Sequence, residues 1–560
     1  MTWVASLGLI SGCAVGQTSP KTGASFVETL RQAQAANDAR AWPTAAVLWE
    51  QVTKSNPVNG DFWLALGDAR YNTQDFHGAI AAYEQAFSLG VQRLHFIVPY
   101  QIARCHARLN ENDAAIEWFE KAMKLGYRDL QGAQNDPDLK SLRDNPEFRD
   151  LTALVDTSKM SRNDGWRYDL HLMAREIERR GYAPFRHTSR DDFEKQVSCL
   201  DQAIPQLSDM QIVIGMMKLT ADVGDGHTMV YGFFERPEFF QNLPVEFAFF
   251  NEGLFIVAAD SRFSDLLGAQ VVRFGDHNVQ DVLHVLDPII SRDNPAAPYV
   301  MGPMRMRNAP LMAALGVIPN PTQVALTVRD GNGASRTVTL PADSPVPSRK
   351  LWDGYPKNWA RFVDSLPGPL PLYLRNSYAD YWFEYLPDSK TVYLQWNHVH
   401  SDSGEPIDKF FDRVGQFVRE HAVEKLVLDM RWNTGGDTGL VPAVLASLIR
   451  DEKIDQPGKL FVITGHRTFS AAQNAVTLIS RFTPAIIVGD TTGSSPNFIG
   501  EDAAIELPYS KLMVSISDLY WQSSWPGDNR VWVAPTIFAP PSFADYRQNR
   551  DGALDAILNY

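Results

Sequence analysis

The sequence predicts a multidomain α+β protein, with an N-terminal α-helical repeat array, a helical segment, a small β-rich domain and a C-terminal α/β core. Three patterns support this fold class. Small and aromatic residues recur in pairs near the N-terminus, and the apolar period changes from helical to alternating after Tyr231. From about Trp352 to the C-terminus, strand and helix patterns alternate. A chain of 560 residues also exceeds the size of a single hydrophobic core.

Composition narrows the classes of function. Hydrophobic residues make up 44% of the chain and charged residues 21%, as in ordinary folded domains. The formal net charge of −14 and the lack of a basic stripe argue against nucleic acid as a partner. Three cysteines provide neither a disulfide framework nor a metal-ligand set, and no phosphate-binding loop occurs. We therefore expect no metal and no cofactor.

Residues 1–22 have the pattern of an export signal. The stretch from Trp3 to Gly16 is short and apolar, and residues 10–13, Ile-Ser-Gly-Cys, resemble the bacterial lipobox, whose cysteine is lipidated. The resemblance implies an exported protein, periplasmic or anchored to the bacterial envelope through a lipid on Cys13. No Lys or Arg precedes Cys13, which departs from a standard signal, and a disordered apolar N-terminus is the alternative.

Residues 24–160 are predicted to form stacked pairs of helices. A small residue is followed by an aromatic one four positions later in three places, at Ala45 and Trp49, Ala79 and Tyr83, and Ala115 and Phe119. Successive pairs start 34 and 36 residues apart, and the pattern resembles tetratricopeptide repeats; an irregular helical bundle is the alternative. Stacked helix pairs form a concave surface, so we expect a protein or peptide partner on this domain.

Three further segments follow the repeats. Residues 165–235 have helical periodicity, residues 240–345 have the pattern of a β-rich lid or PDZ-like domain, and residues 350–560 form the C-terminal core. The alternation of strands and helices in this core predicts a parallel sheet, with functional loops at the carboxyl ends of its strands.

Two of the candidate functional segments are turns. Residues 426–436 form an apolar strand that runs into Gly435 and Gly436, where backbone amides can face a ligand. A tight strand-to-helix turn explains the same glycines equally well. His227 lies in an Asp-Gly-His-Thr turn before the β-rich domain, and a single histidine in such a turn is more often structural.

The third candidate segment is the start of a helix at Ser470. Its hydroxyl would lie at the positive end of the helix dipole, and the amide of Ala471 is placed to bind an oxyanion. Ser470 and Gln473 also match a capping box, in which the serine only satisfies amides at the helix end. Taken alone, this segment favours the capping role.

Together, the order of these segments resembles the tail-specific (C-terminal-processing) serine peptidase family, in particular its tricorn-like branch. The resemblance covers roughly Trp166 to Tyr560 and includes an Asp-Gly-His-Thr turn, an Asp-x-Arg-x-Asn-x-Gly-Gly loop and a Ser-Ala helix start. Further matches follow in order at residues 489–493, 496–501, 507–508, 534–537 and 551–554.

The resemblance implies a catalytic serine and histidine. Ser470 is expected as the nucleophile and His227 as the general base, so turnover should fall as the pH drops through roughly 6 to 7. Many members use a lysine base instead, but Ser495 occupies its place here and Lys511 is the only lysine after Ser470. A Ser–Lys dyad is therefore not expected, and His466 is the rival histidine.

The remaining roles also follow from the resemblance alone. Ala471, with Gly435 or Gly436, would form the oxyanion hole. Asp528 would orient the histidine, with Glu501 as the competing acid. The expected function is that of a serine-type peptidase, a hydrolase that cleaves peptide bonds of protein or peptide substrates through an acyl-enzyme. A catalytically inactive scaffold of the cell envelope is the alternative, because fold does not determine function.

Overall fold

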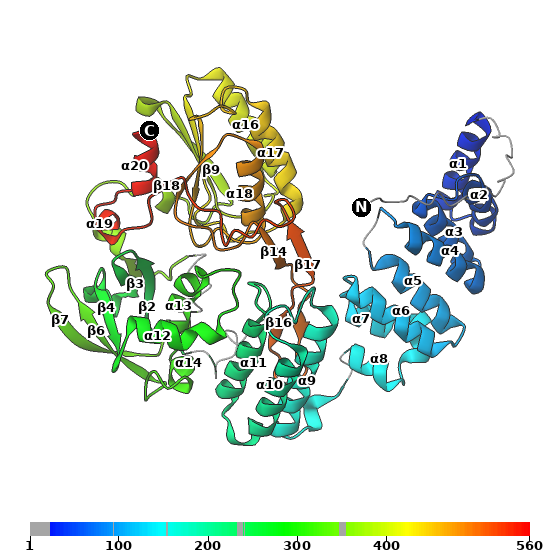
Figure 1. The fold of residues 1–560 in the computed structure, drawn as a ribbon, viewed down its shortest axis with the longest axis horizontal. Helices are drawn as coiled ribbons and strands as arrows, with labels where there is room; N and C mark the ends of the chain where they lie inside the picture. Colours follow the sequence, from blue (N-terminus) through cyan, green and yellow to red (C-terminus); the bar gives the residue numbers. More distant parts are fainter. Residues whose placement is uncertain (1–22, 93–94, 153–154, 232–238, 240, 347–353) are drawn as a thin grey trace, which may run out of the picture. The chain divides into compact units, whose positions relative to one another are not determined.

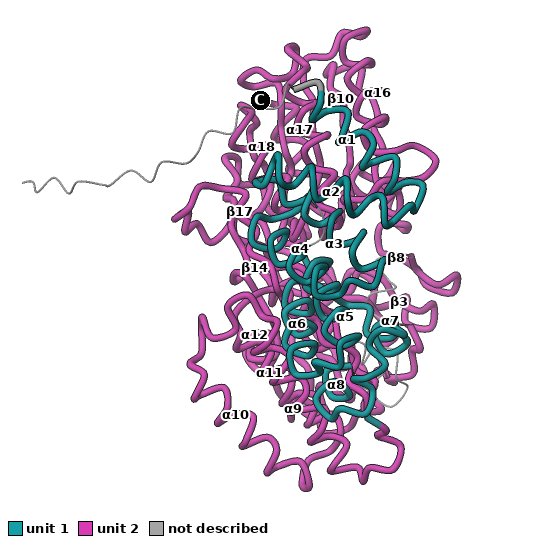
Figure 2. Tube along the Cα trace, turned by 90° about the vertical axis from the view of Figure 1, so that its right-hand side faces the viewer, with its two compact units in different colours: residues 1–155 teal, residues 156–560 magenta. Residues whose placement is uncertain are grey.

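The computed structural model describes residues 23–92, 95–152, 155–231, 239, 241–346 and 354–560. The chain divides into two compact units, residues 1–155 and 156–560, which Figure 2 draws in different colours. The expected export segment at residues 1–22, with Cys13, lies outside the described residues. None of the described helices is long and apolar enough to cross a membrane.

The first unit consists of helices, and the six helices between Gly23 and Lys124 each pack against the next along the chain (Figure 1). Tyr83 is buried, and a Cβ on Gly67 would come within 2.4 Å of its ring, so the glycine permits the close approach of neighbouring helices. The helices of this unit are α1 (Gly23–Asp38), α2 (Trp42–Ser55), α3 (Gly60–Asn72), α4 (Phe76–Leu89), α5 (Ile97–Arg108), α6 (Asn112–Lys124), α7 (Leu130–Asn135) and α8 (Pro146–Leu151).

The second unit begins with three helices, α9 (Arg162–Arg180), α10 (Arg190–Ala203) and α11 (Asp209–Asp222). A three-stranded antiparallel sheet accompanies them, and two of its strands come from the far end of the chain: β1 (Met229–Tyr231), β16 (Met513–Ser515) and β15 (Ile505–Glu506). Asp169 of α9 accepts hydrogen bonds from the amides of Tyr509 and Ser510, at 3.0 and 2.7 Å. The helical segment therefore folds together with residues more than 300 positions later.

A mainly antiparallel sheet follows, with strand order β2-β3-β4-β6-β7 and with β5 and β8 paired to β4 and β3. Its strands are β2 (Val245–Phe250), β3 (Gly253–Asp260), β4 (Gln270–Phe274), β5 (His277–Asn278), β6 (Gln323–Arg329), β7 (Ser335–Pro341) and β8 (Trp359–Arg361). Between β5 and β6 lie the helices α12 (Val279–Leu286), α13 (Ala297–Arg307) and α14 (Ala309–Ala314), which the strand pattern did not predict.

The C-terminal core is a six-stranded sheet of order β18-β13-β12-β11-β10-β9, parallel except for β9. Its strands are β9 (Tyr381–Leu386), β10 (Thr391–Trp396), β11 (Lys425–Asp429), β12 (Leu460–Thr464), β13 (Ile486–Gly489) and β18 (Ile537–Phe538). The helices α16 (Ile407–Glu420), α17 (Val441–Arg450) and α18 (Ala471–Phe482) pack into one apolar cluster, and α20 (Gly552–Leu558) into another (Figure 1). The predicted multidomain α+β class is confirmed.

A separate two-stranded sheet lies between the core and the helical segment (Figure 1). It pairs β14 (Asn497–Gly500) with β17 (Leu519–Gln522) in antiparallel register.

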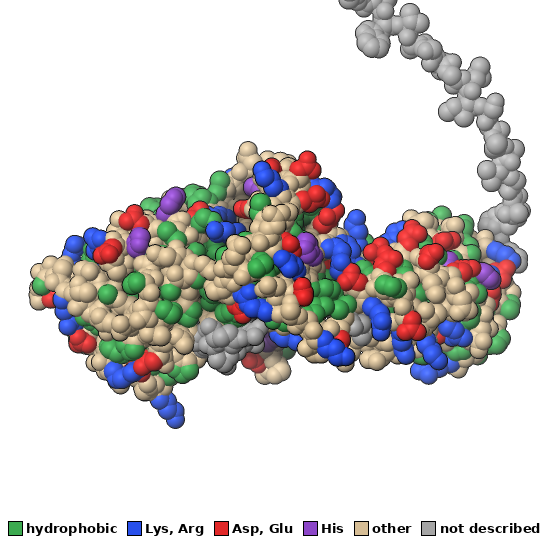
Figure 3. Space-filling view, turned by 90° about the horizontal axis from the view of Figure 1, so that it is seen from below, with side chains coloured by type: hydrophobic (Ala, Val, Ile, Leu, Met, Phe, Trp, Pro, Cys, Tyr) green, Lys and Arg blue, Asp and Glu red, His purple; other side chains and the backbone are tan. Residues whose placement is uncertain are grey.

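On the face drawn in Figure 3, acidic and basic side chains are interspersed among the described residues rather than gathered into a patch of one sign.

Candidate active site

Ser470 occupies the start of α18 in a strained backbone conformation. Its φ of 54° and ψ of −127° are rare for a residue with a Cβ, and such strain is typically retained at functional positions. The Ser470 side chain makes no capping hydrogen bond, and Gln473 instead donates to Thr477. The capping alternative is therefore wrong for this helix, and the hydroxyl is available for another partner.

That partner is His227. The Nε2 atom of His227 lies 3.0 Å from Ser470 Oγ, although the two residues are 243 positions apart in the sequence. The imidazole stacks on the rings of Phe469 and Phe498, with centroid distances of 4.6 and 5.6 Å. Asp225 shapes the turn by accepting the amide hydrogen of His227 at 2.9 Å. Ring stacking and the capped turn together hold the imidazole toward the serine.

The surroundings of His227 change its acidity. Burial lowers the pKa of His227 to about 4, and the negative charge of Asp225 offsets only part of this effect. The imidazole is therefore neutral at pH 7, as a general base must be. The expected loss of turnover between about pH 6 and 7 assumed an ordinary histidine pKa. Because burial lowers the pKa of His227, the loss is expected at a lower pH.

The glycine loop after β11 approaches the serine closely. A Cβ on Gly435 would lie 2.7 Å from Ser470 Cβ, so no other residue fits at this position. The amide of Gly435 donates to Asn433 Oδ1 at 3.0 Å and is not free to bind an oxyanion. The amides of Gly436 and Ala471 have no acceptor within the described part of the chain. Of the two glycines, Gly436 is therefore the one with an available donor.

Neither acid expected from the sequence reaches His227. The Asp528 carboxylate pairs with Arg530 at 2.6 Å, which holds its pKa well below the usual range. Glu501 has a positive φ of 77°, and burial raises its pKa. Among the described residues, His227 Nδ1 has no hydrogen-bond partner. The expectation that Asp528 or Glu501 orients the histidine is thus not met in this geometry, because Asp528 is paired with Arg530 and neither carboxylate contacts His227 Nδ1.

The rival bases are also occupied elsewhere. His466 Nε2 lies 3.3 Å from Asp490 Oδ2, and Lys511 Nζ lies 3.1 Å from Glu506 Oε1 on the surface. Ser495, at the position where a lysine base would be expected from the resemblance, donates to the carbonyl of Val531. His227 is therefore the base that contacts Ser470. No group of three or more His, Cys, Asp or Glu side chains is arranged to hold a metal ion in the described ranges.

A cavity of about 620 Å³ lies beside the glycine loop, between the β-rich domain and the core. Phe249 of β2 and Met304 of α13 line one part of it, and Trp432 and Thr434 line the part nearest the loop. Charged side chains, among them Glu246, Arg307 and Arg467, also line the cavity, so it combines aromatic walls with polar groups, as ligand-binding cavities do.

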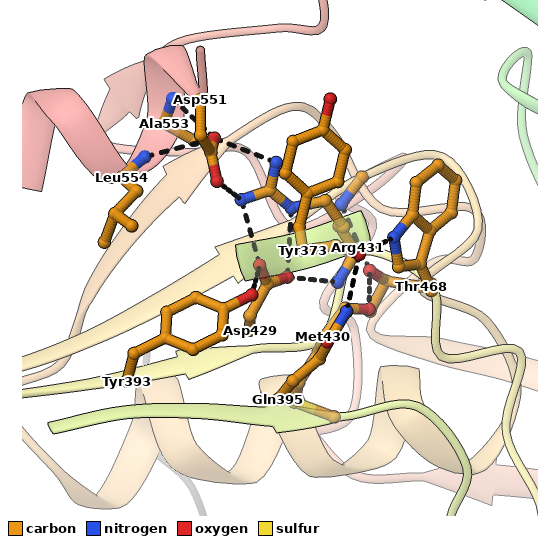
Figure 4. Close-up of polar contacts among 12 residues, drawn as sticks. Tyr373, Tyr393, Gln395, Asp429, Met430, Arg431, Thr468, Asp551, Ala553 and Leu554 are labelled. Atoms are coloured by element: carbon orange, nitrogen blue, oxygen red, sulfur yellow. Dashed lines mark hydrogen bonds and ion pairs between the residues drawn. The ribbon is translucent and has the colours of Figure 1, made fainter. Parts of the chain in front are cut away.

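Sequence reasoning missed a buried ionic network behind the glycine loop (Figure 4). Arg431 donates from Nε to Asp429 Oδ1 at 3.0 Å and binds both carboxylate oxygens of Asp551 at 3.0 and 2.8 Å. Asp551 also caps α20, and Tyr393 donates to Asp429 Oδ2 at 2.7 Å. The network ties the C-terminal helix to the strand that leads into the loop. The Asp-x-Arg pattern and the motif at residues 551–554 were visible in the sequence, but the pairing of Arg431 with Asp551 was not.

Arg431→Leu is expected to lower the free energy of unfolding by about 3–5 kcal/mol, because two buried carboxylates would lose their cation. The side chains of Asp429 and Asp551 are 0% and 6% exposed. Chemical denaturation measures the loss. Arg450→Leu is the control: its side chain is 69% exposed beside Asp412, so its removal should cost less than about 1 kcal/mol. Equal stabilities of the two variants would contradict the expectation.

Comparisons with known proteins bear on both units. A tetratricopeptide repeat model matches residues 30–89 and 64–126. A chloroplastic protein of Arabidopsis thaliana is 36% identical over 62 residues, which are 11% of this chain and 18% of that protein. The chain therefore spans less than a fifth of the length of this curated relative.

Solved structures resemble the larger part of the chain. Mature CPAF is 15% identical with a TM-score of 0.48, over 70% of this chain and 96% of that one. The photosystem II D1 C-terminal processing protease is 12% identical with a TM-score of 0.34, over the same shares. A putative S41 protease from Bacteroides fragilis is 13% identical with a TM-score of 0.24, over 42% of this chain and 66% of that one. The chain thus combines tetratricopeptide repeats at residues 30–126 with a region similar to solved C-terminal processing and S41 proteases.

Proposed function

We propose that this protein is a serine peptidase that hydrolyses peptide bonds of protein or peptide substrates through an acyl-enzyme. One observation carries the proposal: Ser470 Oγ lies 3.0 Å from His227 Nε2 while the serine backbone is strained. A serine hydroxyl is a weak nucleophile until an adjacent base accepts its proton. A serine with only a structural role would need neither the strain nor the buried imidazole.

The mechanism follows from these positions. His227 Nε2 takes the Oγ proton as Ser470 attacks the scissile carbonyl, and the amides of Gly436 and Ala471 bind the resulting oxyanion. His227 then returns the proton to the leaving amine, and the acyl-enzyme remains on Ser470. Water deprotonated by His227 hydrolyses the ester in the second half of the reaction.

The choice of base supports a tricorn-like branch in which histidine replaces lysine. Ser495 stands where a lysine base is expected, and the only lysine after the nucleophile is exposed beside Glu506. A buried neutral imidazole performs the same proton transfer without the need to suppress an ammonium charge.

A fluorophosphonate probe tests the proposal directly, since it reacts only with an activated serine. We expect one covalent adduct on Ser470 of the full chain, located by peptide mass spectrometry, and none on Ser470→Ala. A wild-type chain that stays unlabelled would favour the inactive scaffold.

We also propose a partner for the repeat domain and a cellular location for the protein. The tetratricopeptide repeats would bind a protein partner, since stacked helix pairs present a concave surface. The protein would be exported and anchored by a lipid on Cys13, and the intact mass of the chain from a membrane fraction tests this.

A further inference from the structure

The base in the proposed mechanism has an unsatisfied ring nitrogen. His227 Nδ1 is buried and has no hydrogen-bond partner among the described residues. A neutral imidazole that accepts a proton at Nε2 must carry its own proton at Nδ1, so this atom needs an acceptor. Leaving a buried donor without an acceptor costs about 1–3 kcal/mol.

A second buried atom without a partner belongs to a carboxyl group near the same turn. Asp293 lies between β5 and α13, in the β-rich domain, and its Oδ2 has no hydrogen-bond partner within the described ranges. The other oxygen, Oδ1, accepts the amide hydrogen of Gly226 at 2.7 Å. Gly226 directly precedes His227, and a Cβ on it would lie 3.1 Å from Asp293 Cγ. The unsatisfied donor and the unsatisfied acceptor therefore both lie beside Gly226, one on the next residue and the other on the carboxyl that accepts its amide hydrogen.

Neighbouring residues hold this carboxyl in place. Ser291 Oγ donates to the carbonyl of Thr228 at 2.6 Å. Residues 291–294 therefore contact the turn on both sides of His227, at Gly226 and at Thr228. Asn294 Nδ2 donates to the carbonyl of Thr492 at 3.0 Å. The next amide, that of Gly493, donates to the carbonyl of Thr468, two positions before the nucleophile. Residues 291–294 thus link the two segments that carry His227 and Ser470.

The other carboxyl at the turn is already committed. Asp225 Oδ1 accepts hydrogen bonds from the amides of His227 and Thr228 and from Ser517 Oγ. Its Oδ2 accepts the hydroxyl of Thr228 at 2.8 Å. Asp225 therefore shapes the main chain of the turn, whereas Asp293 Oδ2 makes no hydrogen bond of normal geometry to a described residue, and the nearby Ser494 hydroxyl also lacks a partner.

We propose that Asp293 is the carboxylate that orients His227, accepting the Nδ1 hydrogen with Oδ2 while Oδ1 holds the amide of Gly226. This inference rests on the proposed peptidase function and adds the residue that completes its catalytic group. Asp293 acts through His227 and is a positioning residue, in the role that the sequence had suggested for Asp528.

The acidities of the two groups agree with this pairing. Burial raises the pKa of Asp293 to about 7, with a further rise from Asp225, while the hydroxyl of Ser494 lowers it in part. Burial lowers the pKa of His227 to about 4. Burial thus favours the neutral form of each group, and a hydrogen bond between them would favour the carboxylate and a more basic imidazole. The imidazolium that forms during attack would be stabilised the most, because its positive charge develops beside the carboxylate.

The Asp293→Asn variant tests whether the side chain orients His227 while it keeps the hydrogen bond to the turn. The amide oxygen of asparagine can still accept the Gly226 hydrogen, but its NH2 group faces Nδ1 and cannot accept a proton. We expect the rate of fluorophosphonate labelling at Ser470 and the kcat for fluorescein-labelled casein to fall about 10²- to 10⁴-fold, as for a catalytic triad that loses its carboxylate. KM should change less than about threefold, by the same comparison.

The pH dependence of stability provides a second readout. A carboxyl whose pKa is raised on folding stabilises the fold fully below its ordinary pKa and loses this contribution as the pH rises through the folded value. An asparagine side chain does not ionise, so the Tm of Asp293→Asn relative to that of wild type should rise between about pH 4 and about pH 8. A loss of activity together with this relative gain of stability would exclude simple misfolding.

Two variants complete the experiment. Asp287→Asn changes an exposed carboxylate of the same region, bound to Arg292, and should alter neither rate nor KM. In a His227→Ala background, Asp293→Asn should cause no further loss, because its effect passes through the imidazole. An active wild type with Asp293→Asn within about threefold of its rate would overturn the inference and leave the peptidase function intact, judged against the triad losses. An unlabelled wild type would overturn both.

Discussion

Ser470→Ala should abolish turnover and fluorophosphonate labelling while the protein remains folded. The attacking oxygen is lost, and with it the hydroxyl that His227 Nε2 contacts. The Ser470 side chain does not cap α18, so no capping energy disappears with it. The Tm should therefore stay close to that of wild type, and differential scanning calorimetry checks this beside the activity assay.

Ser470→Gly provides a matched control for this prediction. Glycine adopts positive φ without steric cost, so relief of the strain at Ser470 should raise the free energy of unfolding by about 1 kcal/mol. The variant should be as inactive as Ser470→Ala but more stable. Residual turnover in both variants would show that another residue is the nucleophile.

His227→Ala should lower kcat by about 10³-fold or more, as in other serine triads. The imidazole is the base in contact with Oγ, and its removal leaves the hydroxyl unactivated. Lys511→Ala is the comparison, since its side chain is 64% exposed beside Glu506 and should leave kcat nearly unchanged. Loss of activity in Lys511→Ala with retention in His227→Ala would reverse the assignment of the base.

The pH dependence of kcat/KM follows from the same groups. Protonation of His227 removes the base, so activity should vanish as the pH falls through about 4, the pKa that burial imposes. A partial loss of activity is expected at higher pH, because Asp293, whose pKa is about 7, becomes protonated as the pH falls. Asp225 and Arg186 are the charged groups that influence this pKa. Asp293→Asn should retain only the lower step. A single step near the ordinary histidine value would contradict both shifts.

Local patterns in the chain were enough for several features. The spacing of small and aromatic residues predicted the tetratricopeptide repeats, and residues 30–126 match that family. The alternation of strand and helix segments predicted the parallel sheet of the core, because a helix that connects two strands places them parallel in one sheet. Ser470 and His227 were identified through motifs in loops that follow regular elements, where conformation depends mainly on nearby residues.

Sequence patterns did not predict which segments far apart in the sequence contact one another. The antiparallel pairing of β1 with β16 joins Tyr231 to Met513, and no periodicity encodes which strand another will meet. The same limit applies to the acid beside His227. Asp528 was chosen by its position in a family pattern, yet Arg530, two residues away, takes its carboxylate.

Sequence patterns thus indicated the candidate site residues and many of the helices and strands, while the tertiary structure decided which of their polar atoms meet. Gly435 and Gly436 are equivalent in the sequence, but the side chain of Asn433 occupies one amide and leaves the other open. Asp293 carries no motif, and only packing brings its carboxyl to the turn of Gly226. The physical reason is that hydrogen bonds act over about 3 Å, so residues that are remote in sequence interact only after the whole chain has folded around them.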